Sequence, residues 1–200
     1  MITEIANKIY MHQKNGLEMD KITIEHPELN VHNAYEIQKL SIDHAIKNGD
    51  PLIGWKMGLT SIAKQKSVNV DEPIYGRLTK SMELEENELK MEGLIHPRVE
   101  PEIAFMINKP LFGQDVTAKD VWDATEYIVP ALEVIDSRYK NFSFTLTDVV
   151  ADNASSSKFI IGKQQYSPTY TSWDEINVEL YKNGVKVQSG VSSDVLDHPV

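Results

Sequence analysis

Two stretches near the N-terminus repeat their apolar residues at helical spacing. Residues 2–15 carry one stripe, which ends at Gly16, and residues 33–48 carry another, which ends at Gly49-Asp50-Pro51. The first stripe consists of Ile2, Ile5, Ala6, Ile9 and Tyr10, and the second of Ala34, Ile37, Leu40, Ser41 and Ala45. The pattern predicts two amphipathic helices that form an N-terminal helical cap over residues 1–50.

From Leu52 onward, short apolar segments alternate with Gly, Pro and Asn. Strand-like segments lie at 52–59, 74–76, 99–107, 131–135, 159–161, 176–181 and 185–188. Lys182-Asn183-Gly184 indicates a hairpin turn between the last two. Other segments indicate a helix over 121–127, a turn at 71–73 and an exposed acidic connection over 82–91. Without regular strand–helix alternation, the pattern favours an α+β fold with a barrel-like or rolled sheet core over residues 51–200.

The end of the chain has the pattern of a helix that is about to begin. Residues 192–200 contain Pro199, which suits a first helical turn. A domain that stopped there would end on an opening signal. The pattern therefore predicts a C-terminally incomplete core, from a truncated or naturally shortened chain.

Charge and composition narrow the function. The 200 residues carry 20 Lys+Arg and 30 Asp+Glu, for a net charge of −10, which disfavours nucleic acid as a partner. The absence of cysteine excludes disulfides, thiolate metal sites and cysteine nucleophiles. No apolar run reaches the ~20 residues of a membrane span, and no signal-peptide core is present. These features predict a cytoplasmic protein that acts on a small molecule.

Glutamates provide the sharpest chemical signal. Glu100 and Glu102 share one face of a predicted strand, with Cα atoms roughly 6.5–7 Å apart. Glu133 lies within the apolar run 130–135, where an unpaired charge is costly. Taken alone, each could simply face water. Together, three carboxylates on two strands predict an all-oxygen site of the kind that Mg²⁺ or Mn²⁺ prefers.

Other polar residues are candidates for binding an anion. Lys56 lies between two glycines in an apolar strand, as either a charge partner for a ligand or an edge-strand lysine. Thr60 and Ser61 follow it and can donate to a carboxylate. Arg138 can hold a carboxylate in a bidentate pair or form a surface salt bridge. The small polar cluster 151–156 is either a pocket floor or a plain turn.

Five motifs occur in a characteristic order: GWKMGLTS, DEPIYG, IHPRVEPEIAF, PALEVIDSRY and VVADNASS. Together they resemble the 4-oxalocrotonate decarboxylase and 2-oxopent-4-enoate (2-hydroxypenta-2,4-dienoate) hydratase family, which has a fumarylacetoacetase-like fold. The resemblance implies a mixed β-roll or barrel core with an N-terminal helical cap. It also implies a Mg²⁺ or Mn²⁺ site with Glu100, Glu102 and Glu133 as ligands, Lys56 as the active-site lysine and Ser156 in the substrate pocket. The resemblance also leads us to expect that this chain lacks the family's C-terminal segment, which follows a helix that begins near Leu196.

Two motifs separate the branches of this family. The hydratase motif reads PDFG where this chain has Pro73-Ile74-Tyr75-Gly76. It reads GSR where this chain has Asp136-Ser137-Arg138. Ile74 cannot move a proton and would keep water away from the reacting carbons. The resemblance therefore favours decarboxylation of 2-oxo-3-hexenedioate to 2-hydroxypenta-2,4-dienoate through a metal-stabilised dienolate, in meta-cleavage catabolism of aromatic compounds.

Alternatives to decarboxylation remain. One is a hydratase that adds water to a 2-hydroxydienoate, and another is a catalytically inactive, truncated subunit. The family resemblance also implies a homo-oligomer and a complex with a partner hydratase, with a small 2-oxo mono- or dicarboxylate as the substrate.

Overall fold

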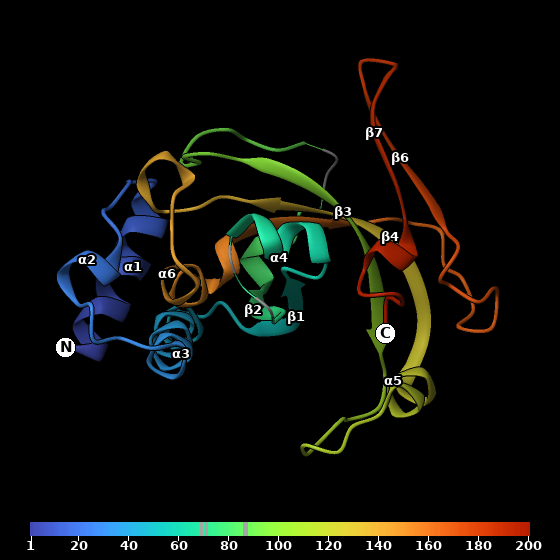
Figure 1. The fold of residues 1–200 in the computed structure, drawn as a ribbon, viewed down its shortest axis with the longest axis horizontal. Helices are drawn as coiled ribbons and strands as arrows, with labels where there is room; N and C mark the ends of the chain where they lie inside the picture. Colours follow the sequence, from blue (N-terminus) through green and yellow to red (C-terminus); the bar gives the residue numbers. More distant parts are fainter. Residues whose placement is uncertain (69, 71, 86–87) are drawn as a thin grey trace. The chain divides into compact units, whose positions relative to one another are not determined.

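The computed structural model describes every residue of the chain except 69, 71, 86 and 87. Its helices and strands confirm the predicted α+β class (Figure 1). Contacts group the chain into two compact units, residues 1–100 with 133–160 and residues 101–132 with 161–200. The boundary after residue 50 stays a prediction. None of the helices among the described residues is long and apolar enough to cross a membrane.

Both N-terminal helices are confirmed. Helix α1 (Ile2–Asn15) ends at Gly16, whose φ of 61° is the left-handed conformation that glycine adopts easily. Helix α3 (Val31–Lys47) begins two residues before the predicted start because Asn30 and Asn33 form a capping box. A short helix, α2 (Ile22–Glu25), lies between them and was not predicted.

The apolar faces of these helices form the core of the first unit. They pack with helix α6 (Leu146–Ala151), which was not predicted either. The cluster includes Ile5, Ile9, Ala34, Ile37, Ile74, Val149 and Val150. In Figure 1 the coils of α1, α3 and α6 lie together on one side of the β1–β2 pair.

Strands β1 (Leu52–Gly58) and β2 (Ile74–Thr79) form an antiparallel pair in which Lys56 lies opposite Gly76. Helix α4 (Ile62–Val68) connects them and was not predicted. Its predicted neighbour, the turn at Asp71-Glu72-Pro73, includes a residue outside the described part of the chain. This connection brings α4 next to the end of the strand that carries Lys56.

A second sheet has the order β3 (Arg98–Ile107), β4 (Thr125–Ile135), β5 (Ser156–Ile161). The prediction of a helix over 121–127 was wrong at its end, because α5 (Ala118–Ala124) stops before Thr125 and β4 begins there. Residues 125–129 are rich in β-branched and aromatic side chains, which favour a strand. The predicted connection 82–91 contains buried Met82, and residues 86 and 87 lie outside the described part.

The predicted C-terminal hairpin is confirmed. Strands β6 (Asn177–Lys182) and β7 (Val185–Val191) pair antiparallel, and Asn183 and Gly184 take positive φ angles of 52° and 78° at the turn. The residues after β7 form a 3₁₀ turn, η4 (Ser192–Asp194). The helix expected near Leu196 is absent from residues 195–200, all of which the structure describes.

Candidate metal centre

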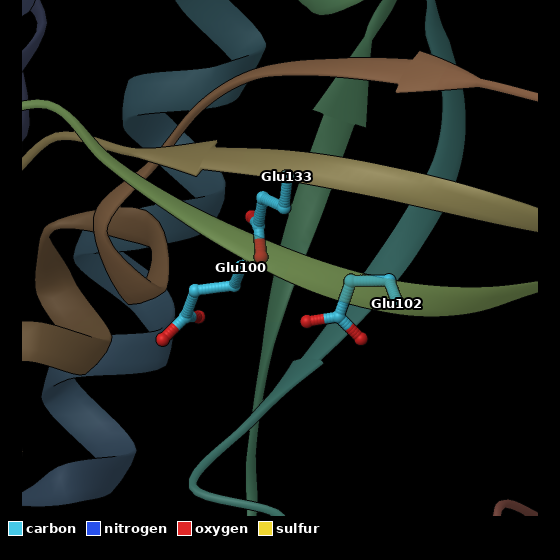
Figure 2. A group of neighbouring side chains, drawn as sticks. All are labelled: Glu100, Glu102 and Glu133. Atoms are coloured by element: carbon cyan, nitrogen blue, oxygen red, sulfur yellow. The ribbon is translucent and has the colours of Figure 1, made fainter. Parts of the chain in front are cut away.

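The three predicted carboxylates meet. Glu100 and Glu102 lie on β3, Glu133 lies on the neighbouring strand β4, and one oxygen from each lies within 4.8 Å of the others. Figure 2 shows their carboxyl groups gathered beside the two strands. Alternation of side chains along β3 places Glu100 and Glu102 on one face, as the sequence predicted. Such a group of oxygens suits a hard divalent cation.

Glu133 is the buried member of the cluster, with 3% of its surface exposed. Its Oε2 lies 2.9 Å from Lys56 Nζ, and Ser156 Oγ donates a hydrogen bond of 3.2 Å to its Oε1. Burial raises the pKa of Glu133, Lys56 opposes that rise, and the nearby charge of Glu100 adds to it. The site thus holds one carboxylate that is costly to ionise without a counter-charge.

Lys56 comes from β1 and points at Glu133. Its side chain is 10% exposed, and its Nζ also lies 3.5 Å from the carbonyl oxygen of Ala154. Gly76, opposite on β2, leaves the space for this side chain. A Cβ there would lie 3.1 Å from Lys56 Cδ and 2.8 Å from Asn153 O. Glycine at position 76 is therefore required for close packing around the lysine.

The cluster 151–156 was predicted as either a pocket floor or a turn. Asn153, Ala154 and Ser155 form a run of positive φ angles of 52°, 52° and 57°. Three consecutive non-glycine residues in this region are strained and need outside support. Asn153 supplies part of it, because its side chain accepts from Arg77 N at 2.7 Å and donates to Arg77 O at 2.8 Å. This run places the Ala154 carbonyl and Ser156 beside Lys56 and Glu133.

Arg138 lies in the interior, with 1% of its surface exposed. Its Nε donates to Asp152 Oδ1, its Nη2 donates to the Asp152 carbonyl, and its Nη1 donates to the carbonyls of Asp136 and Ser156. These bonds use most of the guanidinium donors. The structure therefore gives Arg138 the task of holding the segment 152–156, and substrate binding by this side chain stays a prediction.

The remaining predicted substrate residues lie near the end of β1. Ser61 Oγ accepts a hydrogen bond of 3.2 Å from Lys64 N and so supports the first turn of α4. Thr60 directly precedes Ser61, between β1 and α4. Ile74, paired with Gly58 on the neighbouring strand, is 2% exposed and belongs to the apolar core. Contact of these three residues with substrate stays a prediction.

Lys64 is a site residue that sequence reasoning missed. Its Nζ forms an ion pair with Glu100, and the Lys64 side chain is 54% exposed while that of Glu100 is 22% exposed. No spacing rule connects a lysine in a short polar segment to a glutamate 36 positions later. Asp152 and Asn153 were within the cluster that the sequence marked, but their individual partners were not predictable.

The donor set fits a divalent cation on two grounds. All three side chains offer carboxylate oxygens, which Mg²⁺ and Ca²⁺ prefer. Glu133 Oε2 is also a buried atom that accepts no well-formed hydrogen bond from any described residue, although the Lys56 ammonium is near. A buried oxygen left in this condition is one that a bound cation would satisfy.

Comparisons with known proteins place these features in context. No family model matches the chain. A 2-hydroxyhexa-2,4-dienoate hydratase from Comamonas testosteroni is 40% identical over 197 residues, covering 97% of this chain and 75% of that protein. A 4-oxalocrotonate decarboxylase from a Pseudomonas species is 39% identical over 200 residues, covering 100% of this chain and 77% of that protein.

A solved structure agrees with these relatives. The 4-oxalocrotonate decarboxylase from Pseudomonas putida G7, complexed with magnesium and adipate, matches with a TM-score of 0.95 and 37% identity, covering 99% of this chain and 76% of that one. The same enzyme is also solved with calcium and acetate. The relatives are lyases. This chain belongs to the family of 4-oxalocrotonate decarboxylases and 2-hydroxydienoate hydratases.

Replacing Arg138 should destabilise the protein strongly. Arg138→Met leaves Asp152 buried without its counter-charge, which typically costs about 3–5 kcal/mol of unfolding free energy. Urea denaturation measures the loss. Lys140→Met is the matched control, since Lys140 pairs with Asp20 at an exposed site and should cost at most about 1 kcal/mol. Equal, small losses in the two variants would contradict the supporting role of Arg138.

The raised pKa of Glu133 predicts how the stability of the protein changes with pH. A carboxyl with a raised pKa in the folded state binds more protons folded than unfolded, so its contribution to stability falls as pH rises above its ordinary value of 4.5. In chelator-treated protein, Glu133→Gln should therefore gain stability relative to the original chain between pH 4.5 and pH 7. Thermal unfolding across that range measures the trend. A difference that stays flat with pH would count against it.

Proposed function

We propose that this chain is a decarboxylase that depends on Mg²⁺ or Mn²⁺ and converts 2-oxo-3-hexenedioate to 2-hydroxypenta-2,4-dienoate. The observation that carries the proposal is the meeting of Glu100, Glu102 and Glu133 beside the buried Lys56. The chain's relatives include 4-oxalocrotonate decarboxylases, and one of them was solved with magnesium. We extend the metal and the substrate class of those relatives to this chain.

Glu100, Glu102 and Glu133 would hold the metal. A bound divalent cation supplies Lewis-acid stabilisation for negative charge that develops on the 2-oxo group as CO₂ leaves. Because Glu133 is buried, its carboxylate is held in a fixed direction by Ser156 and Lys56. This fixed direction reduces the reorganisation that the site must undergo during the reaction.

Lys56 is the residue that we assign to proton movement or carboxylate orientation. Its Nζ lies 2.9 Å from the carboxylate of Glu133, which we propose as a metal ligand. The end of the substrate that chelates the metal would therefore lie close to this ammonium. The two neighbouring groups, Glu133 and the Ala154 carbonyl, hold this ammonium in place.

Ile74 favours decarboxylation over hydration. Ile74 stands at the position where the family's hydratases are expected to have an aspartate. It is an apolar residue with no proton to transfer. Its side chain is 2% exposed and therefore lies away from bulk solvent. Hydration is the second candidate, because a 2-hydroxyhexa-2,4-dienoate hydratase is 40% identical to this chain.

The finer structural and cellular assignments are proposals as well. We place the fold in the fumarylacetoacetase-like group and expect a cytoplasmic homo-oligomer that associates with a partner hydratase. The runs of exposed apolar residues on β1, which include Ile53, Trp55 and Met57, agree with an assembly. A catalytically inactive subunit is the remaining alternative.

The reaction is tested by supplying each substrate with Mg²⁺ or Mn²⁺ and following two products. Decarboxylation predicts release of CO₂ from 2-oxo-3-hexenedioate without accumulation of a 4-hydroxy-2-oxo acid. Chelator-treated protein is the control for metal dependence. Formation of the hydroxy acid from 2-hydroxypenta-2,4-dienoate, with no CO₂ release, would support the hydratase. Neither product from folded, metal-bound protein would support the inactive subunit.

Glu102→Gln tests the metal ligands directly. Loss of one carboxylate should weaken Mn²⁺ binding at least about tenfold and abolish turnover, with little change in folding because Glu102 is exposed. Calorimetric titration with Mn²⁺ measures the affinity. Glu126→Gln is the control, since Glu126 is an exposed glutamate on β4 outside the cluster. Unchanged Mn²⁺ affinity in Glu102→Gln would remove Glu102 from the site.

A further inference from the structure

The metal cluster has two lysines in ion pairs, and they differ in exposure. Lys56 contacts Glu133 from a side chain that is 10% exposed, and Lys64 contacts Glu100 from a side chain that is 54% exposed. Both lysines therefore form ion pairs with carboxylates of the cluster. Lys64 is therefore the ammonium at the solvent side of the site.

The backbone that carries Lys64 is anchored next to β1, the strand that carries Lys56. Lys64 N donates to Ser61 Oγ at 3.2 Å, in the turn that leads from β1 into α4. The next residue, Gln65, is 6% exposed, and its Nε2 donates to Leu59 O at 2.9 Å. The base of the side chain is thus fixed beside β1, while its head lies in solvent near Glu100.

A divalent cation would change the electrostatics of this head group. Three carboxylates would then share their charge with the cation, which draws the carboxylate of Glu100 toward itself and weakens its attraction for Lys64. An ammonium that loses part of its counter-charge attracts another anion. A substrate carboxylate away from the metal-chelating end is such an anion. Lys56 lies at the chelating end beside Glu133, and Arg138 is only 1% exposed, so neither reaches that second carboxylate.

We propose that Lys64 is a specificity-determining residue that binds the second carboxylate of a dicarboxylate 2-oxo acid. This inference rests on the proposed function, because it takes the metal-chelated 2-oxo acid as given. It also deepens that function, because it assigns dicarboxylate preference to a side chain on α4 rather than to the metal ligands. The preference holds for either reaction, decarboxylation or hydration, that uses a dicarboxylate.

The test is binding, so that it does not depend on turnover. Adipate and hexanoate have six carbons each and differ in one carboxylate, and both are titrated into Mg²⁺-saturated protein by calorimetry. Lys64→Met should weaken adipate binding about tenfold to a hundredfold, the range for a hydrogen bond to a charged group, and leave hexanoate within about twofold. Lys64→Arg should restore most of the adipate affinity.

Lys66→Met is the matched control, since Lys66 is an exposed lysine on the same helix, and it should change neither ligand. Equally weakened binding of both ligands in Lys64→Met would overturn the proposal. It would show that Lys64 only supports Glu100 and does not bind the second carboxylate. Unchanged adipate binding would also overturn it. If adipate binding depends on Lys64 but the original chain turns over neither candidate substrate, the proposed reaction fails and the assignment of Lys64 stands.

Discussion

The structure of the site depends on compensating one buried charge. Glu133 is 3% exposed, and a carboxylate there is too costly to ionise unless a cation or donors lie beside it. Lys56 and Ser156 supply one ammonium and one hydroxyl. The backbone around Lys56 and Ser156 takes a specific conformation that holds these two groups in place. The burial of Glu133 therefore constrains several elements of the fold.

Two devices meet that requirement. Gly76 lets β2 approach Lys56 closely, since a Cβ would overlap with Asn153 O at 2.8 Å. The left-handed run at 153–155 turns a carbonyl and the following serine toward the site. The strain of that run is offset by Asn153, which bonds to Arg77, and by the Arg138–Asp152 pair at its start. A polar framework, rather than an apolar core, therefore positions the charged centre.

The sequence predicted the parts of the site that follow from local periodicity. Alternation along one strand placed Glu100 and Glu102 on one face, and the apolar run around Glu133 indicated that this carboxylate was unusual. The helices at 2–15 and 33–48 followed from apolar spacing and from Gly16 as a stop signal. These are properties of neighbouring residues, which a sequence displays directly.

The rest depended on contacts between distant residues. Nothing near Arg138 in the sequence shows that Asp152 and three carbonyls enclose its guanidinium. The sequence therefore predicted either a substrate carboxylate or a surface salt bridge as its partner. The helix expected over 121–127 failed at Thr125, where the strand β4 begins and competes successfully for the same residues. Helix α4 was missed because it is short and polar, with an apolar stripe too brief to show a period.

The two lysines of the site differ in exposure, and this difference suits them to different roles. An ammonium at 10% exposure, such as that of Lys56, loses most of its hydration on folding and must keep its partner Glu133 to be tolerated. An ammonium at 54% exposure, such as that of Lys64, keeps most of its hydration and loses little when it exchanges Glu100 for another carboxylate. Burial thus assigns the fixed role to Lys56 and the exchangeable one to Lys64. The same cluster can therefore keep its geometry while its outer cation adapts to the anion that enters.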